Sequence, residues 1–401
     1  MSATSLALNV MRAIATNDIM MLLVYRRSNM EIAKFGVEDF LNVYENDAEW
    51  DIAGSSISAM TLEEIIACGD KTQAEVVDDL MHKTMNYGWI EGSPEFKTEV
   101  AKLYEHVSPS QILQTNGATG ANFLALYALL EPDDHVIALN PTYQQMIDIP
   151  LSLGCKVDLW NIYEDNAWLP KIEELKALIR PNTKMITLCN ANNPTGAVME
   201  RPFLEEIVKI AKSVGAYVLV DEIYRPFEEG IDVPSIVDLY DKGISTCSLS
   251  KTYSVPGVRV GWIVANDELA DLFRKYRDYT MICCGVIDDY LATYVLRNKD
   301  KVLARNRKIV RDNLAIVKEW VANEPRASLV YPKEVSTSCL ALDLPIDDET
   351  FCVNILRDEK VLLVPGSRFN MPGHVRLGYC TKTEILKEGL KRLSKYLRQF
   401  D

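Results

Sequence analysis

Short apolar runs alternate with amphipathic stretches between residues 111 and 265. Six runs are rich in β-branched residues and have the length of buried strands: Gln111–Thr115, His135–Leu139, Lys184–Cys189, Ala216–Val220, Ile244–Leu249 and Val258–Val264. Helical spacing of apolar residues occurs between some of them, in Asn122–Leu130 and in Pro202–Val214, which Gly215 closes. This alternation predicts an α/β fold with a mainly parallel sheet covered by helices. Ligands bind such sheets beyond the carboxyl ends of the strands.

The pattern changes after about Gly285. Two long helices and a smaller α+β region are predicted there: helices Val286–Arg297 and Val302–Val321, strands Ser338–Leu342, Val361–Val364 and His374–Tyr379, and a last helix Glu384–Arg398. We therefore expect three parts. Residues 1–60 form an N-terminal segment that joins the small domain, residues 61–295 the large domain, and residues 296–401 the C-terminal small domain.

The composition is that of an ordinary globular protein, since 48% of the 401 residues are hydrophobic and 25% are charged. The 43 Lys and Arg against 57 Asp and Glu give a net charge of −14. Nucleic-acid backbones and anionic lipid surfaces bind clustered positive charge, so the sequence predicts neither a nucleic-acid partner nor a membrane partner.

No apolar stretch has the length of a membrane span. Ile19–Tyr25 is the longest early stretch, and Arg26 and Arg27 follow it on the side that does not suit a signal peptide. The nine cysteines lack the spacing of zinc ligands, which favours free, buried thiols in a reducing compartment. We therefore expect a cytoplasmic protein without a metal site.

Common nucleotide, metal and hydrolase motifs are missing. Lys251-Thr252 lacks the preceding glycines of a P-loop, and Gly117-Ala-Thr-Gly120 supplies only a fragment of a dinucleotide fingerprint. The four histidines form no helical metal pair, and no Gly-x-Ser-x-Gly elbow occurs. These absences argue against hydride transfer, metal catalysis and serine hydrolysis.

Polar residues of an unusual kind follow three of the predicted strands. The three segments are Asn193-Pro-Thr-Gly196, Asp221-Glu-Ile-Tyr224 and Ser248-Leu-Ser-Lys251, with Arg259 eight residues after the lysine. Because parallel strands end at the same edge of a sheet, these side chains are expected to meet in one site.

With these motifs and His374-Val-Arg-Leu-Gly378, the chain resembles the class I/II aminotransferases over about Tyr87 to Arg376. Members of that family are fold-type-I enzymes that use pyridoxal 5′-phosphate (PLP). The resemblance implies a mainly parallel seven-stranded-type sheet in a large PLP-binding domain, with a smaller α+β domain beside it. It also implies that PLP is the cofactor.

The resemblance makes Lys251 the residue that holds PLP as a Schiff base, since this attachment needs a primary amine. Its ordinary pKa of about 10.4 must fall for the amine to be nucleophilic near neutral pH. Once free, the amine can move the proton between the substrate Cα and the cofactor. Asp221 would keep the pyridine nitrogen protonated. Tyr224 would reach the phenolic oxygen, and these three are the expected catalytic residues.

Further cofactor contacts follow from the same resemblance. The expected set is Ala118, Thr119, Tyr143, Asn193, Asp221, Tyr224, Ser248, Ser250, Lys251, Arg259 and Tyr87. A helix start, hydroxyls and a guanidinium suit the phosphate, and the ring of Tyr143 would stack on the pyridine. In the family, the segment that matches Tyr87 crosses to the other subunit. We therefore expect a homodimer in which Tyr87 reaches the partner's site.

Arg376 matches the arginine that binds the substrate α-carboxylate through two parallel hydrogen bonds. Asn193 and Gly54 are the other expected substrate contacts. The segment Asp51–Ile57 lacks a dicarboxylate signature and resembles that of capreomycidine synthase, a family member that cyclises an arginine-derived substrate. Four more residues are either pocket contacts or packing and surface positions: Arg26, Arg27, Trp89 and Tyr253.

Each motif alone has a structural alternative. Asp221 would also suit a helix cap or a buried ion pair, and Arg376 would suit a structural salt bridge. Asn193-Pro-Thr-Gly196 and Gly117-Ala-Thr-Gly120 have the composition of plain turns. The combination, rather than any single motif, carries the interpretation.

The predicted function is that of a PLP-dependent aminotransferase, which moves an amino group from an L-amino acid to a 2-keto acid by way of Lys251. The alternative is a β/γ-lyase, cyclase or oxidase in the same fold, because residues that hold PLP do not direct the later steps. A sensor without turnover would need a damaged catalytic set or an added DNA-binding segment, and the sequence has neither. The substrates and the pathway are not determined by these motifs.

Overall fold

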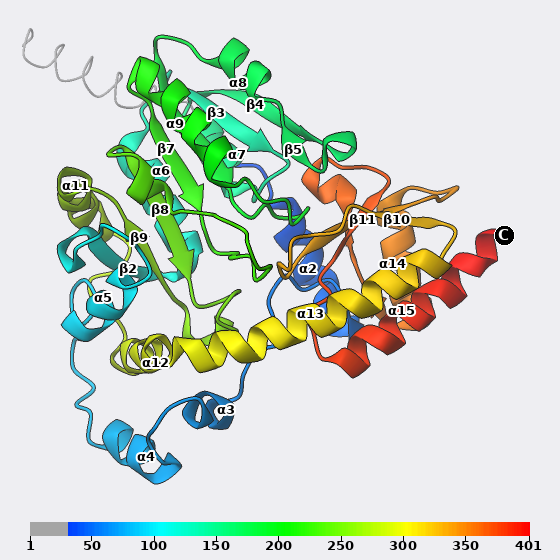
Figure 1. Cartoon of the computed structure of the whole chain (residues 1–401), viewed down its shortest axis with the longest axis horizontal. Helices are drawn as coiled ribbons and strands as arrows, with labels where there is room; N and C mark the ends of the chain where they lie inside the picture. Colours follow the sequence, from blue (N-terminus) through cyan, green and yellow to red (C-terminus); the bar gives the residue numbers. More distant parts are fainter. Residues whose placement is uncertain (1–30) are drawn as a thin grey trace, which may run out of the picture. The chain divides into compact units, whose positions relative to one another are not determined.

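The computed structural model describes residues 31–401 (Figure 1). Residues 34–401 form one unit by their contacts, and the description below concerns that unit. Ile19–Tyr25, Arg26 and Arg27 lie outside the described residues.

The largest sheet has eight strands in the order β2-β9-β8-β7-β6-β3-β4-β5. Their bounds are β2 (Ile112–Asn116), β3 (His135–Asn140), β4 (Lys156–Tyr163), β5 (Leu169–Pro170), β6 (Thr183–Cys189), β7 (Tyr217–Asp221), β8 (Gly243–Ser248) and β9 (Val260–Val264). Strands β8, β7, β6, β3 and β4 pair in parallel, whereas β9 is antiparallel to both neighbours. The predicted mainly parallel sheet is confirmed, and the two-residue β5 extends its seven longer strands at the edge.

All six predicted strands are present, each with its ends within two residues of the expected ones. The sequence pattern missed β4, which runs Lys-Val-Asp-Leu-Trp-Asn-Ile-Tyr and lies near the edge of the sheet. Its polar and apolar residues alternate because only part of the strand is buried. The search for continuous apolar runs therefore passed over it.

Helices cover both faces of this sheet, as successive residues of β7 show. Val218 and Val220 pack into a core shared with α9 (Arg201–Val214). Leu219, which points to the other face, packs into a core shared with α6 (Gly117–Leu129). The other helices of this part of the chain are α3 (Leu62–Ala67), α4 (Gln73–Met81), α5 (Pro94–Ala101), α7 (Gln145–Ser152), α8 (Ile172–Leu178), α10 (Ile236–Leu239) and α11 (Asp267–Arg277). With both faces buried, the strands have near-continuous apolar sequences.

Helix α6 begins at Gly117, whereas the apolar pattern placed the helix at Asn122–Leu130. Its first turn is the Gly117-Ala-Thr-Gly120 segment, so the interpretation as a separate strand–helix turn is wrong. The turn lies against β9, where a Cβ on Gly261 would be 2.4 Å from the carbonyl carbon of Gly117. Small residues on both sides let the helix begin next to the sheet edge, and their turn-like composition hid the helix from the pattern.

The C-terminal part starts with α12 (Val286–Arg297) and the 25-residue α13 (Lys299–Asn323). In Figure 1, α13 runs from α12 to the C-terminal strands and packs against α15 (Thr383–Leu397). The four-stranded antiparallel sheet has the order β10-β11-β14-β13, with β10 (Ala327–Leu329), β11 (Ser338–Leu342), β14 (His374–Leu377) and β13 (Val364–Pro365). Helix α14 (Asp348–Glu359) precedes its last strands.

The predicted single strand Val361–Val364 is wrong, because the run is divided between two sheets. Residues Val361–Leu362 form β12, which pairs in parallel with β1 (Trp50–Asp51), and Val364 begins β13. All four residues are buried, so the apolar pattern contains no sign of the break. The β1–β12 pair connects the segment after α2 (Gly36–Tyr44) to the C-terminal part.

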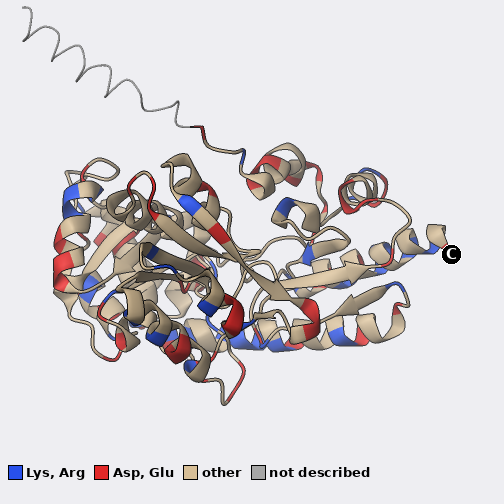
Figure 2. Ribbon diagram, turned by 90° about the horizontal axis from the view of Figure 1, so that it is seen from above, with Lys and Arg blue, Asp and Glu red and all other residues tan. Residues whose placement is uncertain are grey.

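Acidic and basic positions are interspersed along the helices in the view of Figure 2. On α13, for example, Lys308 Nζ lies 2.5 Å from Asp312 Oδ2 one turn later. All nine cysteines are free thiols, and seven of them are buried. Within residues 31–401, no helix combines the length and the apolar character that crossing a bilayer requires.

Candidate active site

A cavity of about 530 Å³ lies where β6, β7 and β8 end, which is in the size range of cofactor sites. Of the residues predicted from the motifs, the following line it: Gly54, Ala118, Thr119, Tyr143, Asn193, Asp221, Tyr224, Ser248, Ser250, Lys251, Arg259 and Arg376. They come from the strand ends of the large sheet and the segments that connect its strands, from β14 and from the segment after β1. The fold thus brings motifs that are far apart in the sequence into one site.

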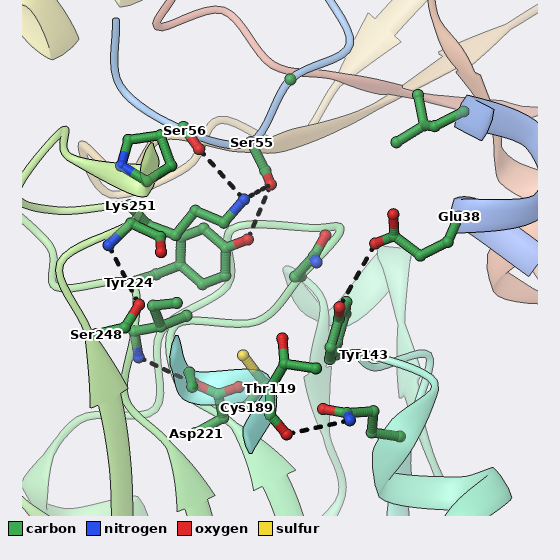
Figure 3. Close-up of a pocket in the computed structure, with 18 of the residues that line it drawn as sticks. Glu38, Ser55, Ser56, Thr119, Tyr143, Cys189, Asp221, Tyr224, Ser248 and Lys251 are labelled. Carbon is green, nitrogen blue, oxygen red and sulfur yellow. Dashed lines mark hydrogen bonds between the residues drawn. The ribbon is translucent and has the colours of Figure 1, made fainter. Parts of the chain in front are cut away.

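Lys251 follows β8 by three residues, and its ammonium group lies beside two serines (Figure 3). Its Nζ donates to Ser55 Oγ at 2.8 Å and to Ser56 Oγ at 3.3 Å. Burial, and secondarily the positive charge of Arg376, lower the pKa of Lys251 to about 8 from its ordinary 10.5. A usable fraction of the amine is therefore neutral, and hence nucleophilic, near physiological pH.

Asp221 ends β7 and is almost completely buried, at 3% exposure. Asn122 Nδ2 donates to its Oδ2 at 2.9 Å, and the Ile223 backbone N–H donates to its Oδ1 at 3.1 Å. Burial nevertheless raises the pKa of Asp221 to about 6. No Lys or Arg within the described residues forms an ion pair with it, so its carboxylate, which lines the cavity, is open to a cationic group of a ligand.

Tyr224 lies three residues beyond Asp221, and its hydroxyl donates to Ser55 Oγ at 3.0 Å. Ser55 therefore receives hydrogen bonds from both Tyr224 and Lys251 (Figure 3). Its own carbonyl accepts a hydrogen bond from Ser336 Oγ at 2.7 Å, which holds the serine in place. Burial raises the pKa of Tyr224, so this phenol stays protonated at neutral pH.

Anion-binding groups converge at the start of α6. The backbone of Ala118 and Thr119 lies in its first turn, where free N–H groups and the helix dipole favour negative charge. A Cβ on Gly117 would be 2.8 Å from Arg259 Nη2, so the guanidinium lies directly against this turn. Ser248 and Ser250 add two hydroxyl groups to this part of the cavity. Such a combination suits a phosphate dianion.

Arg376 is on β14 and is 4% exposed. Its Nε donates to the Ala53 carbonyl at 3.0 Å, and its guanidinium lies 5.5 Å from the ring centre of Phe369. Within residues 31–401 it has no carboxylate partner, so the structural salt bridge considered above is absent from this part of the chain. Burial lowers the pKa of Arg376, and a carboxylate ligand would offset the cost of that burial.

Two further observations indicate a ligand in this cavity. Asn193 Oδ1 is buried and has no hydrogen-bond partner among the described residues. Tyr143 lines the cavity wall, and its hydroxyl donates to Glu38 Oε1 at 3.5 Å, the limit of a hydrogen bond. The side-chain amide of Asn193 and the ring of Tyr143 both line the cavity, and such a wall suits a polar, planar cofactor.

The sequence of this chain matches a known protein family. The model of the family described as aminotransferase class I and II matches residues 59–393. The chain belongs to this family.

Individual relatives agree with that assignment. The aspartate aminotransferase of Thermotoga maritima is 30% identical over 331 residues, which is 80% of this chain and 86% of the relative. Capreomycidine synthase of Streptomyces vinaceus is 25% identical over 366 residues, 90% of this chain and 93% of the relative. A crystal structure of a PLP-dependent aminotransferase from Streptococcus suis is 56% identical, with a TM-score of 0.91, and covers 92% of this chain and 99% of that one.

Three sequence-predicted residues of this family member lie away from the cavity. Tyr87 is 81% exposed and lines a separate hollow with Cys283 and Cys284. Trp89 is also exposed, so it is a surface residue in this chain. Tyr253 is 1% exposed and packs near Trp262, and its role is therefore packing.

Sequence reasoning missed several residues that shape this cavity. Ser55 and Ser56 lie in the segment Asp51–Ile57, where the sequence predicts Gly54 as a contact but neither serine. Asn122 was counted only as the first residue of a helix, although it orients Asp221. Glu38 carried no local signal. A buried polar residue on an apolar helix face would have pointed to Asn122, because such residues need partners.

Proposed function

We propose that this protein is a PLP-dependent aminotransferase that transfers the amino group of an L-amino acid to a 2-keto acid. The observation that carries the proposal is the meeting of Lys251, Asp221 and Arg376 in one cavity that also contains a phosphate-type donor set. Membership of the class I and II family supports the same reaction.

The residues present fit PLP. Lys251 would attach it covalently, and Asp221 would pair with its pyridine nitrogen. Asn193 and Tyr224 would donate to its phenolic oxygen. The phosphate would be held by Ala118, Thr119, Ser248, Ser250 and Arg259, and the ring would lie against Tyr143. When bound, PLP supplies an electron sink that stabilises the charge left on the substrate Cα after deprotonation.

Arg376 would bind and orient the substrate. A guanidinium holds a carboxylate through two parallel N–H bonds, which fixes both position and orientation. Its Nε is already bonded to the Ala53 carbonyl, so the terminal nitrogens remain for the substrate. Burial of the side chain makes the pair stronger than it would be in water, because the local dielectric is low.

Lys251 Nζ would accept the proton of the substrate Cα. A pKa of about 8 suits this task, because an efficient base has a pKa near the working pH. Ser55 and Ser56 would hold the amine at the cavity wall through the hydrogen bonds that they already accept. A cationic pyridine beside Asp221 would in turn favour its ionised form, against the effect of burial.

An absorption experiment tests this function. Purified protein saturated with PLP should show the visible band of lysine-bound cofactor, and single amino acids should convert it to the aminated form without any keto acid. Adding a 2-keto acid should restore the band. Lys251→Ala should lose both the band and the conversion. Release of ammonia together with a keto acid, with no need for an acceptor, would show a lyase instead.

We further infer a homodimer in which Tyr87 contributes to the partner's site. Large apolar side chains are exposed on two adjacent segments: Tyr87, Trp89, Ile90, Tyr279 and Ile282. The Cys284 N–H donates to the Trp89 carbonyl at 2.8 Å, which places the two segments side by side. Contiguous apolar surface of this kind marks an interface.

Mixing two inactive variants tests the shared site. Lys251→Ala retains Tyr87, and Tyr87→Ala retains Lys251, so each mixed dimer has one site with both residues. Random reassociation makes half of the dimers mixed, and activity should recover to about a quarter of wild type. No recovery in dimers shown to be mixed by mass would contradict the inference that Tyr87 acts across the interface.

A further inference from the structure

Two carboxylates at the cavity have no role in the cofactor and α-carboxylate contacts proposed above. The charged lining residues of the cavity are Glu38, Glu45, Asp221, Lys251, Arg259 and Arg376. Under the proposed function, Lys251, Arg259 and Asp221 contact the cofactor. Arg376 takes the α-carboxylate of the substrate. Among the charged lining residues within 31–401, Glu38 and Glu45 then remain for the substrate side chain, and both are acidic.

Glu38 lies on α2 (Gly36–Tyr44), and Glu45 follows the helix directly. Residues 38, 41 and 45 have helical spacing, so Glu38, Leu41 and Glu45 present one face to the cavity. The Gly36 N–H donates to Gln144 Oε1 at 2.6 Å, which ties the start of α2 to α7 beside the site. The acidic face is therefore held in position by the fold.

The carboxylate of Glu38 points toward the hydroxyl of Tyr143 in Figure 3. Within residues 31–401, neither Glu38 nor Glu45 lies within 4.0 Å of a lysine, arginine or histidine nitrogen. Many other acidic residues in this range have such a partner; Asp39, next to Glu38, contacts Arg368 at 3.4 Å. No described lysine, arginine or histidine forms an ion pair with Glu38, so its carboxylate is open to a cationic group that enters the cavity.

A second, independent observation indicates an ionic ligand in the same cavity. Arg376 is 4% exposed, and only its Nε has a hydrogen-bond partner among the described residues. A buried guanidinium with free terminal nitrogens calls for an anion. The cavity therefore offers a cation for one carboxylate and acidic groups for a positive charge.

We propose that the amino-group donor is an amino acid whose side chain carries a positive charge, an amine or a guanidinium, which Glu38 and Glu45 recognise. This inference rests on the proposed aminotransferase function. Leu41 and Phe35 line the same wall, where they can cover the methylene groups of a long basic side chain. A dicarboxylic substrate would place a second carboxylate near Glu38, and no further cation among residues 31–401 lines the cavity to compensate it.

Binding of analogues that lack an α-amino group to the holoenzyme tests this inference, because such analogues cannot undergo transamination at Cα. The probes are 6-aminohexanoate, hexanoate and adipate, which share a chain length and a carboxylate but differ in the charge at the far end. Isothermal titration calorimetry should show that 6-aminohexanoate binds roughly tenfold or more tightly than hexanoate, and that adipate binds most weakly. Adipate binding as tightly as 6-aminohexanoate would overturn the inference.

Glu38→Gln removes the charge but keeps the shape of the side chain. The substitution should weaken the binding of 6-aminohexanoate by about tenfold and strengthen the binding of adipate. The affinity for hexanoate should stay within about twofold of the wild-type value. The matched control is Asp47→Asn, because Asp47 is exposed, follows α2 and lies outside the cavity lining. Equal weakening of all three probes by Glu38→Gln would show that Glu38 acts through the local structure, and would contradict a role in charge recognition.

Conversion of the cofactor band by amino acids separates this inference from the proposed function. Lysine, ornithine or arginine should convert it at lower concentration than norleucine, glutamate or aspartate. If glutamate or aspartate converts it best, the aminotransferase function stands and the basic substrate is wrong. If no amino acid of any charge converts it, the proposed function itself fails.

Discussion

The lowered pKa of Lys251 has a direct kinetic consequence. Only the neutral amine attacks the aldehyde of PLP. With a pKa of about 8, about one amine in ten is neutral at pH 7, whereas a pKa of 10.5 would leave about one in 3000. The cavity should therefore accelerate attachment of PLP at pH 7 by roughly 300-fold relative to a free lysine.

The direction of the pH dependence follows from the fact that the Lys251 amine is a base. Its neutral form increases with pH, so the rate of PLP attachment should rise about tenfold per pH unit below 8 and level off above it. Stopped-flow absorbance of apoprotein mixed with PLP, between about pH 7 and pH 10, measures this. The lower limit of about pH 7 keeps the measurement away from the titration of the PLP phosphate, which occurs near pH 6.

Single substitutions separate the causes of the lowered pKa of Lys251. Arg376→Gln removes a positive charge that disfavours the ammonium, so the midpoint should move upward, toward 10.5. Arg357→Gln removes the same charge on the surface and should leave the midpoint unchanged. Lys251→Ala measures the background rate at which PLP reacts with the other amines of the protein. A wild-type rate that keeps rising through pH 10 would refute the reasoning.

Three further predictions concern the structure around the site. The pKa of Asp221 is raised to about 6 from 3.8, so the folded protein binds this proton more tightly than the unfolded chain does. The unfolding free energy of the apoprotein should therefore fall, relative to that of Asp221→Asn, as the pH rises from about 4 to 6. Denaturant titrations that show a constant difference between the two proteins would contradict this. Asn122→Ala leaves Asp221 Oδ2 and the Thr246 hydroxyl without a partner, and should cost about 1–3 kcal/mol in unfolding free energy and weaken PLP binding measured by equilibrium dialysis. A Cβ on Gly378 would lie 1.7 Å from the Gly54 carbonyl oxygen, so Gly378→Ala should cost about 1–3 kcal/mol in thermal unfolding, whereas Gly257→Ala, with nothing within 4 Å, should be near neutral.

Local sequence patterns located most of the large sheet, and the resemblance to the class I/II aminotransferases located most of the cavity residues. Apolar runs located strands such as β3, β6 and β8, because their buried residues are contiguous in the chain. Motifs at the carboxyl ends of β6, β7 and β8 located Asn193, Asp221 and Lys251, since a parallel sheet brings these ends together. These features depend on neighbours within a few residues, which is the range that periodicity and motif spacing describe.

Only the tertiary structure decided which distant residues complete the site. Ser55 meets Lys251 across 196 positions of sequence, and Asn122 meets Asp221 across 99. The same holds for the break in Val361–Val364, where a uniformly buried run enters two sheets. Glu38 belongs to this group as well, because only the packing of α2 beside α7 brings its carboxylate to the cavity. Such contacts are fixed by chain packing, and a local pattern contains no information about what lies across the cavity.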